Sequence, residues 1–314
     1  MRTGPIAALA LLGVLAGCTD VGAGLVATPV ESSARPALVE ATVPLSRAPK
    51  AIELPRGGVR LFPEHQLVAF VGAPGSPALG PLDDNLDERA ARLERLAASY
   101  RGGRRILPVM ELIVVTAQGA AGNDGKYRSR IDPQQIDRYL AVARKHKMLL
   151  MLDVQPGQAK PLDEVKRLER WLRQPDVGLA VDPEWQVGRG QVPGRVFGRT
   201  SGAELNSIAA YLSGLVRQDK LPEKLFVFHQ LTKQIIDAEQ VLRPHPGVAM
   251  VKSVDGIGTA AAKEATYRQL TTKLPRGVHT GFKLFYQEDT RHGTLMTPTQ
   301  VLSLRPRPEL VIYE

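Results

Sequence analysis

The chain has 314 residues, 43% of them hydrophobic, and a formal net charge of +9 from 41 Lys and Arg against 32 Asp and Glu. This length allows one large domain or two small ones, with enough apolar residues for a sizeable core. The positive charge favours anionic surfaces such as phospholipid headgroups or cell-wall polymers. Nucleic acid is not predicted as a partner, because the basic residues are scattered and form no block interleaved with aromatic residues.

The N-terminus predicts an exported protein. A basic start is followed by an apolar run over residues 6–15 and by Leu-Ala-Gly-Cys, which ends at Cys18. This pattern is typical of a signal peptide, and the run is too short to span a bilayer. The Leu-Ala-Gly-Cys sequence resembles the lipobox of bacterial lipoproteins. The resemblance implies cleavage before Cys18 and acylation of its thiol and its new amino group. Two or three acyl chains would anchor the protein in the cell membrane, facing outside the cytoplasm.

The alternative is an ordinary signal peptide with a chance cysteine. Cys18 is the single cysteine of the sequence, so neither an intrachain disulfide nor a cysteine-based metal site can form. Ala, Pro, Ser, Thr and Val recur throughout residues 18–57 without helical or strand periodicity, which predicts a disordered tether. The expected organisation is a signal peptide at 1–17, the tether at 18–57 and a folded domain at 58–314.

Within the folded domain, short apolar segments rich in β-branched residues alternate with segments of helical periodicity. Eight segments are predicted to be strands: Leu67–Gly72, Ile106–Ala117, Met148–Val154, Val177–Asp182, Lys224–Gln230, Val248–Val254, Thr280–Tyr286 and Glu309–Tyr313. Helices are predicted over "DERAARLERLAASY", after Asp132-Pro133, over "PLDEVKRLERWLRQ", after a capping box at Ser201–Glu204, over the small residues that follow Asp255, and after Thr297-Pro298.

Eight near-continuous apolar strands with a helix in nearly every interval predict parallel strands and right-handed crossovers. Over about 250 residues this is the size of a (β/α)8 TIM-type barrel. The eighth helix is expected to be missing, because the sequence ends at Glu314, directly after the eighth strand. A doubly wound open sheet is the alternative, although "FVGAPGSPALG" contains neither G-x-G-x-x-G nor a P-loop lysine.

In such a barrel the active site lies at the carboxyl ends of the strands, and these ends are rich in polar residues. From the third strand to the seventh they supply Asp153 and Gln155, then Asp182, Glu184 and Trp185, then His229, then Lys252 and Asp255, and then Lys283 and Tyr286.

The sequence "VDPEW" carries the prediction of a general acid. Residues i and i+2 of a strand point the same way, so Asp182 and Glu184 are expected to face the barrel mouth together. Each carboxylate would raise the proton affinity of the other, which suits Glu184 as a general acid. Asp153 would supply a second carboxylate, and Trp185 a flat face for a sugar ring. The alternative is that the acids bind loop amides and that Trp185 anchors a loop.

The other strand-end residues are candidates for substrate binding: Gln155, His229, Lys283, Tyr286 and Asp255. Lys283 and Tyr286 remain open between pocket and packing. The six histidines show no metal-ligand spacing, so His229 is interpreted as a hydrogen-bonding residue, and neither a metal nor a cofactor is predicted. No G-x-S-x-G sequence supports a serine nucleophile.

The folded part resembles a group of exported actinobacterial proteins with glycoside-hydrolase-like barrels. The phrases that carry the resemblance are "FVGAPGSPALG", "AGNDGKY", "LDVQPG", "DPEW", "FVFHQ" and "DGIG". The group implies the barrel more than a reaction. Asp182-x-Glu184 also resembles the acid pairs of chitinase-like (family 18) and muramidase-like (family 25) barrels, in which the position of Glu184 would be the acid. The longer D-x-x-D-x-D-x-E phrase of chitinases is absent, because "VGLAV" precedes Asp182.

The leading hypothesis is a membrane-anchored lipoprotein whose barrel hydrolyses a cell-envelope or environmental glycan, with Glu184 as proton donor, Asp182 tuning it and Asp153 stabilising or nucleophilic. The second is a barrel that binds a glycan or envelope component without cleaving it. A phosphodiester-cleaving barrel would need a metal cluster that the sequence does not suggest. The protein is predicted to be a monomer.

Overall fold

The computed structural model describes residues 51–100 and 102–314. The predicted signal peptide, Cys18 and most of the predicted tether lie outside these residues. Contacts with the barrel begin earlier than Gly58. Leu54 is buried with the residues that fill the barrel, and the Arg56 guanidinium donates to Glu94 at 2.5 Å and to the main-chain oxygen of Lys147 at 3.1 Å.

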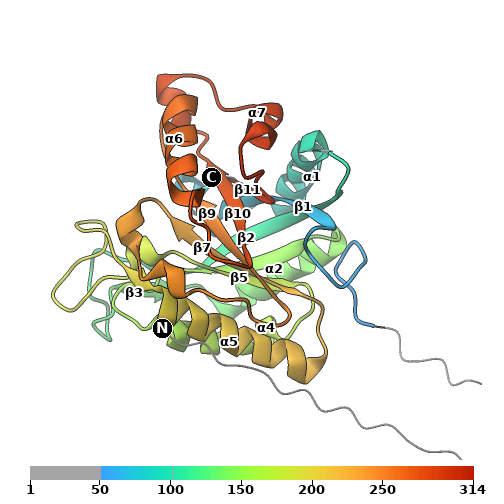
Figure 1. The fold of residues 1–314 in the computed structure, drawn as a ribbon. Helices are drawn as coiled ribbons and strands as arrows, with labels where there is room; N and C mark the ends of the chain where they lie inside the picture. Colours follow the sequence, from blue (N-terminus) through green and yellow to red (C-terminus); the bar gives the residue numbers. More distant parts are fainter. Residues whose placement is uncertain (1–50, 101) are drawn as a thin grey trace, which may run out of the picture. The chain divides into compact units, whose positions relative to one another are not determined.

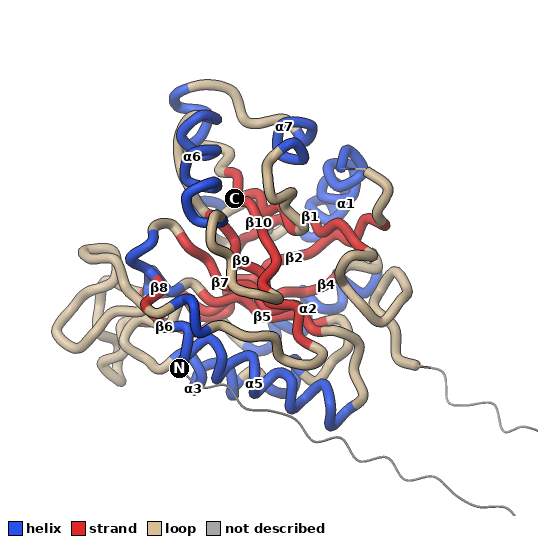
Figure 2. Tube along the Cα trace, in the orientation of Figure 1, coloured by secondary structure: helices blue, strands red, loops and turns tan. Residues whose placement is uncertain are grey.

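Eight parallel strands form a closed barrel, which confirms the predicted (β/α)8 fold (Figures 1 and 2). The order around the barrel is β1-β2-β4-β5-β7-β9-β10-β11, and β11 pairs with β1 again. This last pairing excludes the open doubly wound sheet. The barrel strands are β1 (His65–Gly72), β2 (Arg105–Ala117), β4 (Leu149–Val154), β5 (Val177–Val181), β7 (Lys224–Gln230), β9 (Val248–Val254), β10 (Val278–Leu284) and β11 (Leu310–Tyr313).

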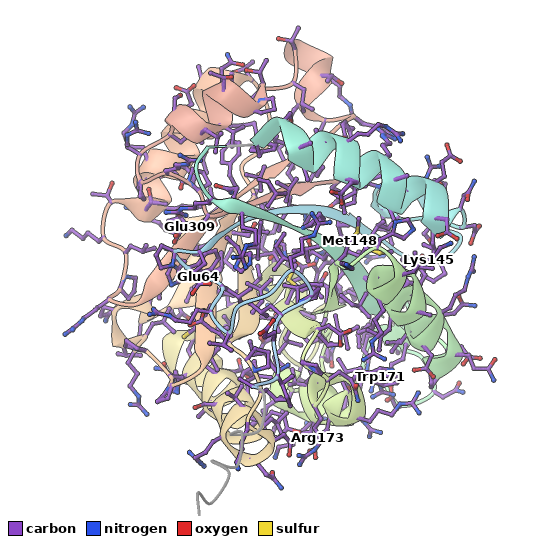
Figure 3. The ribbon with its side chains drawn as sticks, turned by 90° about the vertical axis from the view of Figure 1, so that its right-hand side faces the viewer. Glu64, Lys145, Met148, Trp171, Arg173 and Glu309 are labelled. Atoms are coloured by element: carbon purple, nitrogen blue, oxygen red, sulfur yellow. The ribbon has the colours of Figure 1, made fainter. Side chains whose placement is uncertain are left out.

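The strands are apolar throughout because both of their faces are buried. In β1, Val68 and Phe70 point outward to the helices, whereas Leu67, Ala69 and Val71 point into the barrel. The same alternation divides the core into an outer shell between sheet and helices and an inner column inside the barrel, and Figure 3 shows side chains filling both.

Helices cover most of the outside of the barrel (Figure 1). They are α1 (Leu86–Ala97), α2 (Pro133–Lys145), α3 (Pro161–Arg167), α4 (Glu169–Leu172), α5 (Gly202–Asp219), α6 (Ala260–Thr271) and α7 (Pro298–Ser303). Their starts follow the predicted capping residues. The Asp132 side chain accepts from the Gln134 amide, and Thr297 forms a capping box with Gln300.

One detail at the start of α5 differs from the sequence prediction. Ser201 caps α5 by accepting from the Glu204 amide, but the Glu204 carboxylate accepts from Gln186 and Thr200, both at 2.8 Å, instead of completing a capping box. The connection from β7 to β9 is described in full and contains only short 3-10 turns and the two-residue strand β8 (Ile236–Asp237). Helices therefore fill six of the seven intervals.

Two short strands lie outside the barrel order. β3 (Arg128–Arg130) pairs antiparallel with the end of β2, and β6 (Thr200–Ser201) pairs with β8. Glu314 directly follows β11. Among the helices of residues 51–100 and 102–314, none combines the length and apolar character needed to cross a bilayer.

Candidate active site

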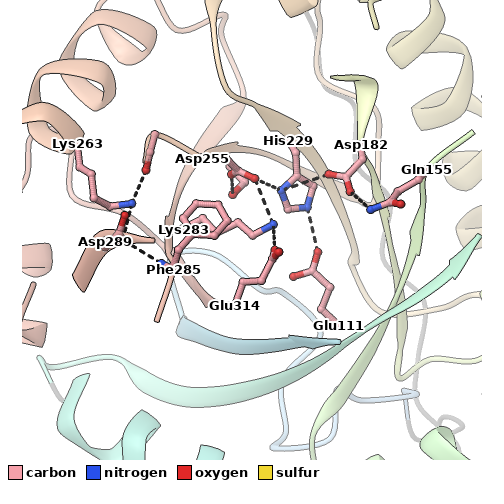
Figure 4. A network of polar contacts seen from close by, with 12 residues as sticks. Glu111, Gln155, Asp182, His229, Asp255, Lys263, Lys283, Phe285, Asp289 and Glu314 are labelled. Carbon is pink, nitrogen blue, oxygen red and sulfur yellow. Dashed lines mark hydrogen bonds and ion pairs between the residues drawn. The ribbon is translucent and has the colours of Figure 1, made fainter. Parts of the chain in front are cut away.

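Polar side chains replace the apolar ones inside the barrel at the carboxyl ends of the strands. Glu111 in β2, Asp153 in β4, His229 in β7 and Lys283 in β10 are each at most 6% exposed. They occupy inward positions that follow apolar ones, such as Val227 two residues before His229. Figure 4 shows that Glu111, His229 and Lys283, together with residues that follow the neighbouring strands, form a connected network of polar contacts.

His229 is at the centre of this network. Its Nε2 lies 2.9 Å from Glu111 Oε1, and its Nδ1 lies 2.7 Å from Asp255 Oδ2. Burial lowers the pKa of the imidazole, but the carboxylates of Asp255 and Asp182 outweigh this effect, and its pKa lies well above the usual value. Both ring nitrogens can therefore donate, each to one carboxylate, as an imidazolium.

Lys283 joins the network from β10. Its Nζ lies 2.6 Å from a carboxylate oxygen of Glu314 and 3.4 Å from Asp255 Oδ2. Burial lowers its pKa, whereas Glu314 and Asp255 raise it, so the net pKa is well above that of a free lysine. Asp255, facing both cations and also accepting from Ser253 at 2.7 Å, has its pKa held well below the usual range in spite of burial.

Two further carboxyl groups, those of Asp153 and Asp182, face the same interior. Gln155 accepts from the Ala117 amide at 3.1 Å and donates to Asp182 Oδ2 at 3.1 Å, which fixes the orientation of Asp182. Asp182 Oδ1 and Asp153 Oδ1 have no hydrogen-bond partner among the described residues. Burial, followed by the charge of Asp182, raises the pKa of Asp153 well above its usual range.

Glu184 lies beside Asp182, but not for the predicted reason. β5 ends at Val181, and Glu184 belongs to a 3-10 turn at Pro183–Trp185, so the two acids do not alternate along a strand. Burial raises the pKa of Glu184 to about 8, with further contributions from Asp182 and Asp255. Its Oε2 is buried without a hydrogen-bond partner in the described part of the chain. At neutral pH this carboxyl group holds a proton that it can transfer.

The segment after Glu184 folds back onto it. The Gly198 amide donates to the Glu184 main-chain oxygen at 2.6 Å, and the Arg199 amide donates to that of Gln186 at 2.9 Å. A side chain at Gly198 would overlap the Gln186 backbone, so only glycine permits this approach. The fold-back brings Phe197, which is 65% exposed, to the same cavities as Trp185.

These groups surround a cavity of about 360 Å³ at the barrel mouth, here called the central cavity. The cavity brings together seven of the predicted site residues: Asp153, Gln155, Asp182, Glu184, Trp185, Asp255 and Lys283. Apolar groups of Phe197, Ile257 and Phe285 line other parts of its wall. Convergent polar groups in a partly apolar cavity are typical of ligand sites.

The remaining predicted residues lie elsewhere. His229 is fully buried and is not part of the cavity wall, so it can act on a ligand only through Asp255 or Asp182, which do line the cavity. Tyr286 follows β10 and stacks with Tyr313 at 5.5 Å between ring centroids, among residues outside the barrel. Lys252 also points outward, donating to the main-chain oxygen of Leu270 at 2.8 Å.

Sequence reasoning missed Glu111, Glu314 and Phe197. The sequence contained a signal for Glu111, because an acid inside the apolar run "PVMELIVV" needs a polar partner when the strand is buried. Phe197 had none, because its position depends on the fold-back of the chain after Glu184.

Two residue groups have the donor types of a metal site: Glu111, Asp153 and His229, and Asp182, His229 and Asp255. Their ligand atoms lie within 4.8 Å of one another. His229 belongs to both, and each of its nitrogens already faces a carboxylate at hydrogen-bond distance. This geometry is that of a histidine whose two ring nitrogens are both used in hydrogen bonds to carboxylates.

No family model and no curated protein matches the sequence. Among solved structures, a hyperthermophilic endo-beta-1,4-glucanase with substrate aligns at a TM-score of 0.39 and 7% identity, over 66% of this chain and 77% of that one. An endo-beta-mannanase/endo-beta-glucanase of Prevotella bryantii aligns at a TM-score of 0.38 and 9% sequence identity, over 76% of this chain and 40% of that one. Because both TM-scores are below 0.5, the barrel assignment rests on the strand pairing described above.

Proposed function

We propose that this barrel hydrolyses glycosidic bonds of a cell-envelope or environmental glycan, with Glu184 as the general acid. The observation that carries the proposal is the Glu184 carboxyl group. It is buried, its pKa is raised to about 8, one of its oxygens has no partner among the described residues, and it lines the same cavity as Asp153 and Asp182. Hydrolysis of a glycosidic bond requires such an acid together with a second carboxyl group.

In this mechanism Glu184 transfers its proton to the glycosidic oxygen as the bond from that oxygen to the anomeric carbon breaks. The carboxylate of Asp182 stabilises the positive charge that develops on the sugar ring. A water molecule then adds its hydroxyl to the anomeric carbon, and its remaining proton passes to the Glu184 carboxylate, which restores the acid. Asp153 has a raised pKa, so in the empty site it is suited to donating a hydrogen bond to a sugar hydroxyl. It becomes a nucleophilic carboxylate only after losing its proton.

The test is Glu184→Gln, which keeps shape and hydrogen bonding but removes the transferable proton. Hydrolysis in a screen of chitin, peptidoglycan and plant β-glycans is expected to fall by about 10² to 10⁴, while binding of the same glycan changes little. The control is Glu264→Gln, which removes a carboxylate from an exposed position of α6, outside the central cavity, and should leave the rate unchanged. Equal rates for wild type and Glu184→Gln would refute the proposed acid.

A non-catalytic glycan-binding barrel is the second candidate, and one observation favours it. Asp255, Glu111 and Glu314 are each paired with His229 or Lys283, which is an arrangement of structural ion pairs as much as of catalytic acids. Measurable glycan binding without turnover by the wild-type protein would favour this candidate. Trp185→Ala should then weaken binding, because the indole face is lost.

We also propose that the protein is a lipoprotein held in the cell membrane through acylated Cys18. The support is the Leu-Ala-Gly-Cys sequence that follows a short apolar run. Cys18→Ser should leave an unprocessed precursor or a soluble form in a detergent partition of cells. A wild-type protein that enters the aqueous phase, or whose mature chain begins at another residue, would contradict the anchor.

A further inference from the structure

We propose that the substrate is a linear glycan of at least three sugars, held in a groove that crosses the whole barrel mouth and is cut beside Glu184. The position of the cut rests on the proposed hydrolysis, whereas the groove does not depend on it. Two further cavities adjoin the central cavity, and each shares wall residues with it.

The first adjoining cavity, here called the Trp185 cavity, has a volume of about 220 Å³. It shares Glu184, Trp185 and Phe197 with the central cavity and adds Arg195 and Val196. Two aromatic side chains with an adjacent cation offer a face on which a sugar ring can stack and a donor for its hydroxyls.

The second adjoining cavity, here called the Arg92 cavity, has a volume of about 270 Å³ and shares Glu288 and Glu314 with the central cavity. The Arg92 guanidinium lies 5.2 Å from the ring centroid of Tyr286 and 5.5 Å from that of Phe70. Held over two rings, the planar group keeps its N–H donors at its edge, where hydroxyl oxygens of a sugar can accept from them. Tyr286 therefore contributes to a ligand site at this place and not in the central cavity.

The barrel topology places these two cavities on opposite sides of the mouth. The Trp185 cavity is built from the segment after β5, whereas the Arg92 cavity is built from segments after β1, β10 and β11. In the barrel order, β11 is four strands from β5 in either direction. The three cavities therefore form a line across the mouth, which matches an extended chain of sugars better than a single sugar.

The distribution of acids gives the chain a direction. Glu184 lines both the central and the Trp185 cavities, whereas Asp153 and Asp182 line only the central one. The bond that Glu184 protonates thus joins a sugar in the Trp185 cavity to one in the central cavity, and the anomeric carbon of that bond lies in the central cavity. The leaving, reducing-end part of the glycan occupies the Trp185 cavity. The non-reducing end extends to Arg92.

The experiment measures binding to the non-cleaving Glu184→Gln protein by calorimetry. The probes are β-1,4-linked N-acetylglucosamine oligomers of two to six sugars and peptide-free peptidoglycan strands of the same lengths. Kd is expected to fall about tenfold or more from two to four sugars and then to level off. Affinity that is independent of length, or no measurable binding of either series, overturns the groove.

Two variants, each with a matched control, test the two ends of the groove. Phe197→Ala and Arg92→Ala should each raise the Kd of the tetramer roughly two- to tenfold. Arg95→Ala removes the same charge from an exposed site on the same helix, and Val59→Ala trims an exposed apolar residue before β1. Both controls should leave Kd unchanged. Arg92→Lys, which keeps the charge but not the planar group, should behave like Arg92→Ala.

Hydrolysis by the wild-type protein separates the groove from the reaction. The probe for this test is a three-sugar oligomer labelled at its reducing end. Because one cavity lies on the reducing-end side of the cut and two lie on the other side, cleavage should release the label on the shorter fragment. Release on the longer fragment overturns the assigned direction. Binding that depends on length without any cleavage refutes the proposed hydrolysis and leaves the groove standing. Cleavage of all lengths with equal binding refutes the groove and leaves the hydrolysis standing.

Discussion

The two ends of the barrel interior are made by the same eight strands but from opposite kinds of side chain. Near the amino ends the inward positions are apolar and include Leu67, Leu107, Leu149, Leu225 and Leu310. At the carboxyl ends the inward positions hold Glu111, Asp153, His229 and Lys283, all buried. A fully buried leucine stabilises the fold by about 1.5–3 kcal/mol, whereas a buried charge destabilises it unless it is paired.

The apolar end of the barrel contributes to stability, and the polar end contributes to the chemistry of the site. The apolar end holds the strands together, and its buried His65 hydrogen-bonds main-chain oxygens of Arg60 and Leu61, outside the central cavity. The polar end has fewer buried apolar groups and is therefore less stabilising. It holds carboxyl groups with shifted pKa values next to a cavity, and such groups are concentrated at functional sites. Substitutions at the apolar end should thus change stability alone, and those at the polar end both stability and activity.

The largest effect is expected for His229→Ala. Removal of the imidazolium leaves Glu111 and Asp255 buried without their shared partner, and breaking such a pair costs about 3–5 kcal/mol in the free energy of unfolding. Urea denaturation measures it. His146→Ala, which removes a histidine paired with Asp87 at the surface, is the control and should cost little. Similar losses for the two variants would mean that the polar network is not held by His229.

The next effect is a pH dependence caused by Glu184. Its pKa is raised from 4.5 to about 8 in the folded protein, so the folded state binds a proton that the unfolded state has released. The stability of the wild type relative to Glu184→Gln should therefore fall as pH rises from 4.5 to about 8 and then level off. Denaturation of both proteins across this range measures the difference. A difference that stays constant with pH would contradict the raised pKa.

A smaller effect is expected for Asp182→Asn. The charge of Asp182 is one cause of the raised pKa of Glu184, so removing it should move the alkaline limb of the pH–rate profile from about 8 to lower pH. A movement of roughly one pH unit corresponds to about 1.4 kcal/mol. Asp289→Asn, at a buried acid paired with Lys263 outside the central cavity, is the control. It should leave the limb in place.

The smallest effect is expected at the apolar end. Leu310→Met replaces a side chain of the inner column near the amino end by one of similar volume and should cost less than about 1.5 kcal/mol of stability, with kcat unchanged. Thermal unfolding and initial rates measure the two quantities. A large loss of rate from this substitution would show that the two ends of the barrel are not independent.

The barrel could be predicted from the amino-acid sequence alone. Apolar, β-branched segments such as Val248–Val254 and Lys224–Gln230 have the predicted bounds, because strands buried on both faces need continuous apolar residues whatever their neighbours are. Capping residues such as Asp132 and Thr297 likewise act within a few residues of chain. The carboxyl-end rule then placed Asp153 and Asp182 at the mouth.

The sequence does not show which strand-end residues face the cavity or what charge each one has, because both depend on the tertiary packing. Lys252 and Lys283 look alike in the sequence, yet the first points outward and the second inward, because the inward register depends on barrel closure. Glu184 reaches the cavity through a 3-10 turn and not through strand alternation. Its proton affinity depends on burial and on the charges of Asp182 and Asp255, and Asp255 is far from Glu184 in the chain. Such long-range electrostatics have no local sequence signature.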